Sequence, residues 1–136
     1  MKVRTLLAVV AAASLLVGCS KADLRELGRE TEEALRDAGD ALDELAGKAE
    51  GPIRDAAEHA LDAADEARDA SRAFADHPTA ETRQALETAA DHVEDAKREL
   101  TGLVYRAPEP VKDLVQRVIE TLTDVGRRIE RQLDES

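Results

Sequence analysis

Aromatic residues and cysteine are almost absent from this chain of 136 residues, which holds no Trp, one Tyr, one Phe and one Cys. The scarcity of aromatic side chains excludes a platform on which bases or sugar rings could stack. A single cysteine cannot form an internal disulfide, so packing must supply the stability. The formal net charge of −11 also argues against nucleic acid as a partner, because affinity for nucleic acid comes mainly from cations that meet phosphates.

The N-terminal stretch has no acidic residue and is typical of a secretory signal. Lys2 and Arg4 are followed by an uncharged apolar run from Thr5 to Gly18. This run is shorter than the roughly 20 helical residues that a bilayer crossing needs. A basic start, a short apolar segment and small residues before a cleavage point describe a signal peptide. We therefore expect residues 1–18 to be removed.

The only cysteine, Cys19, ends this run in the sequence LVGC. The motif resembles the lipobox of bacterial lipoproteins, and the resemblance covers residues 1–19. It implies cleavage between Gly18 and Cys19, an S-diacylglycerol group on the thiol, and a fatty acyl group such as palmitate on the new amine. The alternative is a secreted protein with a free thiol. By the rule of the same family, Ser20 implies the periplasmic face of the outer membrane if the cell is Gram-negative.

Prolines divide the chain after Cys19 into four similar segments. Pro52, Pro78 and Pro110 each suit the first turn of a helix, where the missing N–H costs nothing. Within each segment, apolar residues recur at alternating steps of three and four, which is the heptad pattern of coiled coils and packed helices. The predicted helices cover about 22–49, 52–75, 79–106 and 110–134.

These patterns predict an all-α fold, an antiparallel up-down bundle of three or four amphipathic, Ala-rich helices. Residues 19–21 form the tether and residues 22–136 the acidic helical domain. The alanine face of segment 52–75 is expected to pack around segment 110–134. Gly28 and Gly39 weaken the first helix, so we expect it to fray or to act as a stalk. A competing architecture is a set of amphipathic helices that stay open until they meet lipid or a partner.

Two histidines occupy equivalent places in a short repeat, "AAEHALDA" at 56–63 and "AADHVEDA" at 89–96. Folding the second and third segments into a hairpin brings His59 and His92 to nearly the same height, flanking the apolar seam. Two imidazoles with carboxylates nearby could bind Zn²⁺ or titrate near neutral pH. The alternative is two surface histidines among solvated charges. We predict no cofactor and no metal site, with His59 and His92 as the candidate ligands if one exists.

No pattern of catalytic residues emerges, so we predict that the protein is not an enzyme. Acidic residues fall mostly outside the apolar seams, and several pair with arginines four residues on, as in Glu32–Arg36 and Asp124–Arg128. Tyr105, at the third junction, is expected to cap the end of the bundle. It is also the best single candidate for a contact with a partner.

The function expected from these features is that of a non-enzymatic lipoprotein of the cell envelope, attached to its membrane through Cys19. Its helical domain would bind another envelope protein or form oligomers. The alternative is a protein that handles lipids or hydrophobic ligands, whose helices open and lay their apolar faces on acyl chains.

Overall fold

Four helices make up almost all of the computed structural model, which describes residues 6–135 and the side chains from Asp23 onward. The helices are α1 (Leu6–Lys48), α2 (Gly51–Asp76), α3 (Ala80–Leu103) and α4 (Glu109–Asp134), with a short 3-10 helix, η1 (Val104–Arg106), before the last. No strand occurs in this part of the chain. The predicted all-α class is confirmed.

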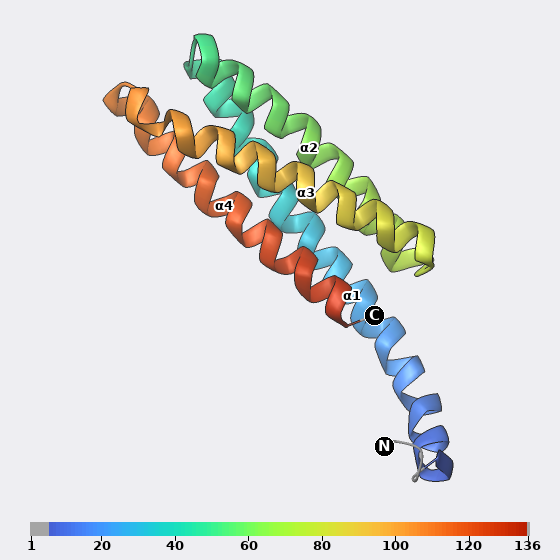
Figure 1. Ribbon diagram of the computed structural model, residues 1–136. Helices are drawn as coiled ribbons and strands as arrows, with labels where there is room; N and C mark the ends of the chain where they lie inside the picture. The colour runs from blue at the N-terminus through green and yellow to red at the C-terminus, as the bar shows by residue number, and fades with distance from the viewer. Residues whose placement is uncertain (1–5, 136) are drawn as a thin grey trace.

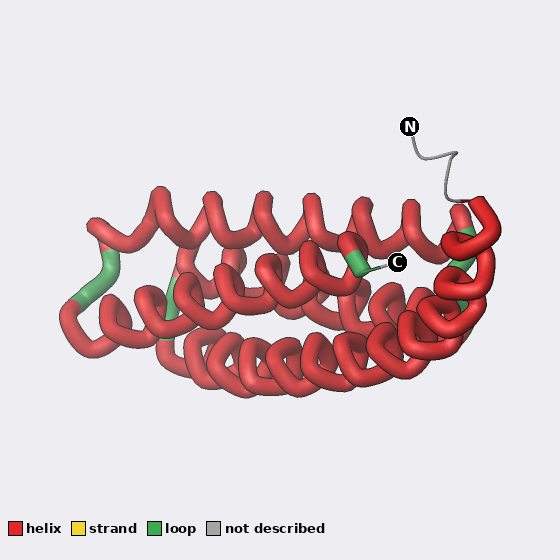
Figure 2. Tube along the Cα trace, turned by 90° about the horizontal axis from the view of Figure 1, so that it is seen from below, coloured by secondary structure: helices red, strands yellow, loops and turns green. Residues whose placement is uncertain are grey.

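The helices form an antiparallel up-down bundle (Figure 1). Each helix packs against its neighbours in chain order, and α4 closes the ring against α1. The connections gather at the two ends of the bundle (Figure 2). We call the end that holds η1 and the α1–α2 connection the tip. The opposite end, which holds the α2–α3 connection and from which α1 extends, is the base.

The alanine face of α2 packs against α1 and α3, with α4 diagonally opposite. The expectation that this face surrounds the last segment is therefore wrong. Short connections place consecutive helices side by side, so α2 is flanked by the helices that precede and follow it. The small side chains let α1 and α3 approach the backbone of α2 closely.

The helix ends follow from local sequence. Gly51 has a φ of +63°, a left-handed conformation that glycine adopts without strain, and Pro52 then fixes the first turn of α2. Thr79 caps α3, because its Oγ1 accepts from the N–H of Thr82 at 3.1 Å and its own N–H donates to Thr82 Oγ1 at 2.9 Å. Pro108 precedes α4 in extended conformation.

Two boundaries differ from the prediction. The third helix ends at Leu103 rather than near 106, because residues 104–106 tighten into η1 before Pro108. The first helix begins at Leu6 and runs unbroken to Lys48. From Leu24 onward it packs along the bundle between α2 and α4, so fraying or a stalk role is wrong for this part of the first segment.

The core combines small and large side chains. Alanines dominate the buried face of α2, and branched or larger apolar residues come from the other helices and from Phe74. Burial of each large side chain stabilises the fold by roughly 1.5–3 kcal/mol. The largest fully buried apolar side chains are Phe74, Leu42, Leu45, Leu86, Leu100, Leu122, Ile129, Val115, Val118 and Val125.

Candidate functional site

The predicted lipidation site lies in the N-terminal part of α1, which extends beyond the base of the bundle (Figure 1). The side chain of Cys19 is outside the described residues, so cleavage between Gly18 and Cys19 and acylation of Cys19 stay predictions. Over the residues that the structure describes, none of the helices combines the length and the apolar character that a membrane crossing requires.

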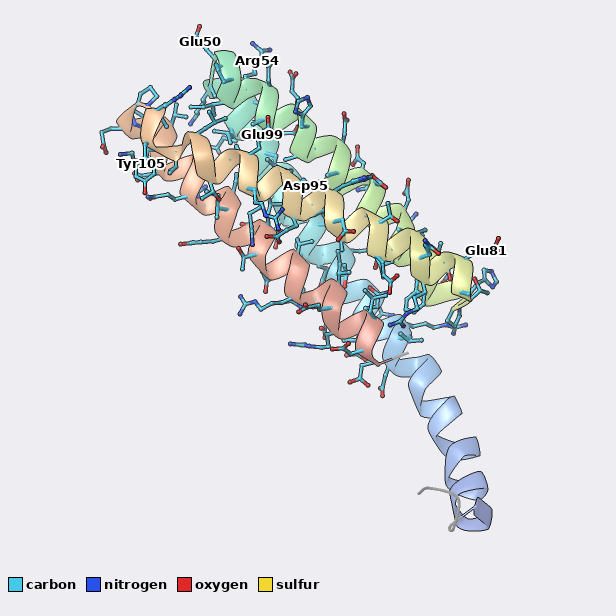
Figure 3. The ribbon with its side chains drawn as sticks, viewed as in Figure 1. Glu50, Arg54, Glu81, Asp95, Glu99 and Tyr105 are labelled. Atoms are coloured by element: carbon cyan, nitrogen blue, oxygen red, sulfur yellow. The ribbon has the colours of Figure 1, made fainter. Side chains whose placement is uncertain are left out.

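The tip carries Tyr105, the one large hydrophobic side chain that is exposed among residues 23–135. Its exposed fraction is 87%, so it does not cap the core as a packing residue would. Figure 3 shows it projecting from the bundle, at the end where Glu50 also lies and away from Glu81 at the base. The sequence also suggested a contact with a partner for Tyr105, and the exposure favours this second role.

The exposure of Tyr105 follows from the tight turn that precedes α4. The N–H of Ala107 donates to the carbonyl of Val104 at 3.3 Å, which closes a 3-10 turn around residues 104–106. Leu103 and Val104 pack partly against the core, and Ala107 is buried. These neighbours occupy the positions of the turn that face the core, so Tyr105 faces solvent.

A largely apolar hollow lies at the tip, between the α1–α2 connection and the start of α4. Its lining combines apolar residues, among them Ile53 and Val111, with the charged residues Lys48, Glu50 and Arg106. The remaining lining residues are Ala49, Pro52, Leu103 and Pro108.

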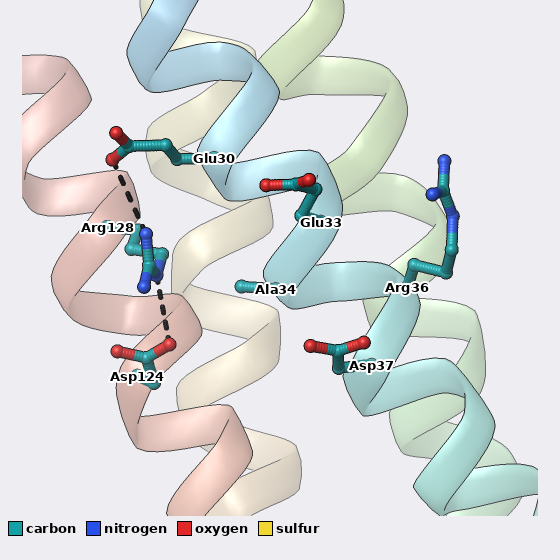
Figure 4. Close-up of a pocket in the computed structure, with 7 residues that line it drawn as sticks. All are labelled: Glu30, Glu33, Ala34, Arg36, Asp37, Asp124 and Arg128. Atoms are coloured by element: carbon teal, nitrogen blue, oxygen red, sulfur yellow. Dashed lines mark hydrogen bonds and ion pairs between the residues drawn. The ribbon is translucent and has the colours of Figure 1, made fainter.

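A second, acidic hollow lies between α1 and α4 (Figure 4). Arg128 bridges the two helices there: its Nε donates to Asp124 Oδ2 at 2.9 Å, and its Nη1 lies 3.4 Å from Glu30 Oε1. The hydrogen bond to Asp124 raises the pKa of Arg128, and burial offsets part of this effect. Glu33 and Asp37 complete a lining of four carboxylates, whose charge Arg128 and Arg36 only partly neutralise.

The predicted ion pairs are met in part. The Asp124–Arg128 pair on α4 is confirmed. Glu32, expected to pair with Arg36 on its own helix, instead accepts from Arg72 of α2 at 3.0 Å. This hydrogen bond raises the pKa of Arg72. Packing of α1 against α2 supplies a partner across the interface that sequence spacing along one helix cannot reveal.

His59 and His92 lie on one face of the α2–α3 pair, but each is paired with a glutamate of the opposite helix. Nδ1 of His59 is 3.4 Å from Glu99 Oε1, and Nδ1 of His92 is 2.8 Å from Glu66 Oε1. The hydrogen bond to Glu66, followed by its negative charge, raises the pKa of His92. Glu66 lies two turns of α2 beyond His59. The imidazoles of His59 and His92 are therefore offset along the helix pair and do not lie at the same height, in contrast to the prediction from the sequence.

The positions of the two glutamates in the sequence could have predicted these pairs. Each lies one heptad after a histidine, Glu66 after His59 and Glu99 after His92. In an antiparallel pair, this spacing lets the histidine of each helix meet the glutamate of the other. Among the described residues, no group of three or more His, Cys, Asp or Glu side chains is placed so that it could hold a metal ion.

A buried polar contact lies near the base. The hydroxyl of Ser71 donates to Gln132 Oε1 at 2.8 Å, and Gln132 Nε2 donates to the carbonyl of Ser71 at 3.0 Å. Both side chains are fully buried, and each provides hydrogen bonds to polar groups of the other residue. Because this contact joins α2 to α4 across the bundle, it favours one register of the helices over slipped alternatives.

No protein-family model, curated protein or solved structure matches this chain.

Proposed function

We propose that the protein is a non-enzymatic lipoprotein of the cell envelope whose helical bundle presents its tip to another envelope protein. The observation that carries this proposal is Tyr105, 87% exposed at the tip, in a bundle whose other large apolar side chains are buried or half-buried over the described range. The apolar hollow lies at the same end of the bundle. Tyrosine is enriched among the residues that contribute most of the binding energy at protein interfaces.

The arrangement of the ends supports this proposal. The segment that precedes Leu24 leaves the bundle at the base, and Tyr105 lies at the tip (Figure 1, Figure 3). α2 has 26 residues, which corresponds to about 39 Å at 1.5 Å per residue. A chain that is attached to a membrane through Cys19 therefore holds its contact surface about one bundle length from the lipid.

The core supports the interaction role over the handling of lipids. The seams of all four helices meet in one core, and no buried side-chain N or O atom among the described residues lacks a hydrogen-bond partner. A role in lipid handling would require this core to open. The polar surface is strongly acidic, whereas helices that lie on membrane surfaces are typically basic.

Photo-crosslinking in living cells tests the proposed surface. A benzophenone amino acid replaces Tyr105 in one strain and Asp65 in another, because Asp65 lies on the flank of α2 with a side chain that is 73% exposed. We expect irradiation to give one protein adduct of discrete mass from position 105 and none from position 65. Adducts with phospholipid alone, or equal protein adducts from both positions, would contradict the proposal.

A further inference from the structure

The apolar hollow at the tip, which we call the tip hollow, has a volume of about 200 Å³. Its lining comes from the end of α1, the start of α2, the end of α3 with η1, and the start of α4. Sites for drug-sized ligands usually occupy roughly 300–1,000 Å³. The tip hollow is smaller, so it suits one apolar side chain of a partner better than a whole small molecule.

The backbone around the tip hollow is conformationally restricted. Pro52 and Pro108 line it, and their rings fix the backbone where α2 and α4 begin. The hydrogen bond from the N–H of Ala107 to the carbonyl of Val104 closes the turn before α4. Tyr105, whose side chain is 87% exposed, does not fill the hollow. Because the site is already formed, a partner would lose little binding energy to the ordering of this backbone.

The charge of the tip is opposite to that of the molecule. The two connections at this end, residues 48–54 and 104–112, hold four basic and two acidic residues, whereas the whole chain has a formal net charge of −11. Figure 3 shows Glu50 and Arg54 at this end, with Tyr105. An acidic partner would therefore be repelled by the flanks of the bundle and attracted to its tip.

Arg106 is the cation of the tip hollow that is best placed to bind such a partner. Its side chain is exposed, and it forms no ion pair or side-chain hydrogen bond within the described range 23–135. Lys48 also lines the hollow, but its Nζ lies 3.2 Å from Glu44 Oε2 on the same helix. Glu50 is the acidic residue of the lining, and these two cations outnumber it. A guanidinium group can bind a carboxylate through two parallel hydrogen bonds.

We propose that the tip hollow receives one apolar side chain from an acidic segment of a partner protein, and that Arg106 binds a carboxylate next to that side chain. This inference rests on the proposed function, because it requires the tip to be the contact surface. Burial of the apolar side chain supplies affinity, and the carboxylate fixes the orientation. An anionic membrane fits less well, because its headgroups would repel the acidic flanks of the bundle.

The test uses the full lipidated chain in nanodiscs of phosphatidylcholine, with isotope-labelled methyl groups on Ile, Leu and Val. The probe is the peptide acetyl-Gly-Glu-Leu-Glu-Gly-amide, added at neutral pH and low salt and followed by methyl NMR. We expect concentration-dependent shifts at Ile53, Leu103 and Val111, which line the tip hollow. A peptide with lysine in place of both glutamates, or with serine in place of leucine, should leave these signals nearly unchanged.

Two variants that remove the same charge from the tip provide a matched comparison. Arg106→Gln should weaken the affinity for the acidic peptide by about fivefold or more, because the carboxylate loses its charged donor. Arg54→Gln should change this affinity by less than about twofold, because Arg54 does not line the hollow and lies 3.6 Å from Glu58 on its own helix. Circular dichroism of each variant verifies that the helices are retained.

Photo-crosslinking from position 105 separates the failure of this inference from the failure of the proposed function. If a discrete protein adduct forms there but the acidic peptide gives no selective shifts, or the two variants behave alike, the inference is wrong and the contact surface stands. If position 105 gives no protein adduct, the proposed function is wrong and the inference with it. Shifts that follow only the addition of phosphatidylglycerol vesicles would assign the tip to an anionic membrane and would also overturn the inference.

Discussion

Gly28 lies where α1 and α2 come close to each other near the base. A Cβ atom added there would lie 2.8 Å from the Cβ of Ala75, a distance that real Cβ atoms do not adopt. A Cβ added at Gly39, eleven residues further along the same helix, would meet nothing within 4 Å. The two glycines are therefore indistinguishable by helix propensity, but only one is required by packing.

Substitution of these glycines by alanine should change the stability in opposite directions. Gly28→Ala gains helix propensity but forces α1 and α2 apart, so we expect the free energy of unfolding to fall by about 1–2 kcal/mol. Gly39→Ala should raise it by about 0.5–1 kcal/mol, because alanine is the better helix former and no neighbour must move. Urea unfolding followed by circular dichroism measures both changes. Stabilisation by Gly28→Ala would show that the bundle accommodates the methyl group.

Ser71 and Gln132 present a second test at the scale of the residue. Ser71→Ala removes the hydroxyl that donates to Gln132 Oε1 and leaves a buried amide oxygen without this donor. We expect a loss of about 1–3 kcal/mol in the free energy of unfolding. Thr88→Ala, at an exposed position of α3, is the control and should not lower the stability. An equal effect of the two substitutions would argue against the buried contact.

At the scale of the helix, the pairing of α2 with α3 should respond to pH through His92. Its pKa is raised in the folded protein, chiefly by the hydrogen bond to Glu66. A raised pKa means that the contribution to stability is fully present below the pKa of the unfolded state, about 6.5, and is lost as the pH rises through the folded-state value. Other charges on this face, Asp91 and Asp95, act in the same direction.

The variant His92→Gln isolates this contribution. The unaltered protein should be more stable than the variant at about pH 5.5, below the pKa of a free imidazole, and the difference should shrink as the pH rises and the imidazole of His92 loses its proton. Urea unfolding at the two pH values measures the difference. His77→Gln serves as the control, because His77 is exposed in the α2–α3 connection. A difference that stays constant or grows with rising pH would contradict the assigned pair.

The helices themselves could be predicted from the sequence, because prolines and a three-four apolar period are local signals. Pro52 and Pro110 lie in the first turns of α2 and α4, and most apolar residues of the three-four pattern are buried in all four helices. The pairing of His59 with Glu99 could not be predicted in the same way. It depends on the register of two helices, which a turn of a few residues and the packing of the core determine together.

The direction of the Tyr105 side chain at the tip could not be predicted from the sequence. The concentration of Leu103, Val104 and Tyr105 before two prolines indicated a packed end, and the first two residues do pack partly against the core. The direction of Tyr105 depends on the tightening of residues 104–106 into a 3-10 turn. That change rotates side chains relative to an α-helix, and no local pattern in these residues reveals it.

At the scale of the molecule, one continuous core predicts cooperative unfolding. We expect residues 20–136, produced without lipid, to melt in a single transition in which the calorimetric and van't Hoff enthalpies agree. The enthalpy should be about 0.7 kcal/mol per residue near 60 °C. Differential scanning calorimetry provides both values. A broad transition without a heat-absorption peak would favour helices that stay open until they meet lipid.

The attachment of the whole molecule should depend on Cys19. We expect Cys19→Ala to move the protein from the membrane fraction to the soluble or unprocessed fraction, while Ser20→Ala remains membrane-bound. Mass spectrometry of the N-terminal peptide should show diacylglycerol and a fatty acyl group on Cys19 in the unaltered protein. Membrane attachment that persists in Cys19→Ala would contradict the lipobox assignment.

The unbroken course of α1 would limit the movement of the bundle relative to an anchor on Cys19. From Cys19 to Leu24, the first described residue that is buried, the backbone is helical and advances about 7.5 Å. A lipid anchor on Cys19, as proposed, would therefore hold the bundle through a short helix and not through a flexible linker. The tip would then stay at a nearly constant height above the lipid. Such a molecule would meet a partner by diffusion in two dimensions, and only a partner whose binding surface lies at that height could bind it.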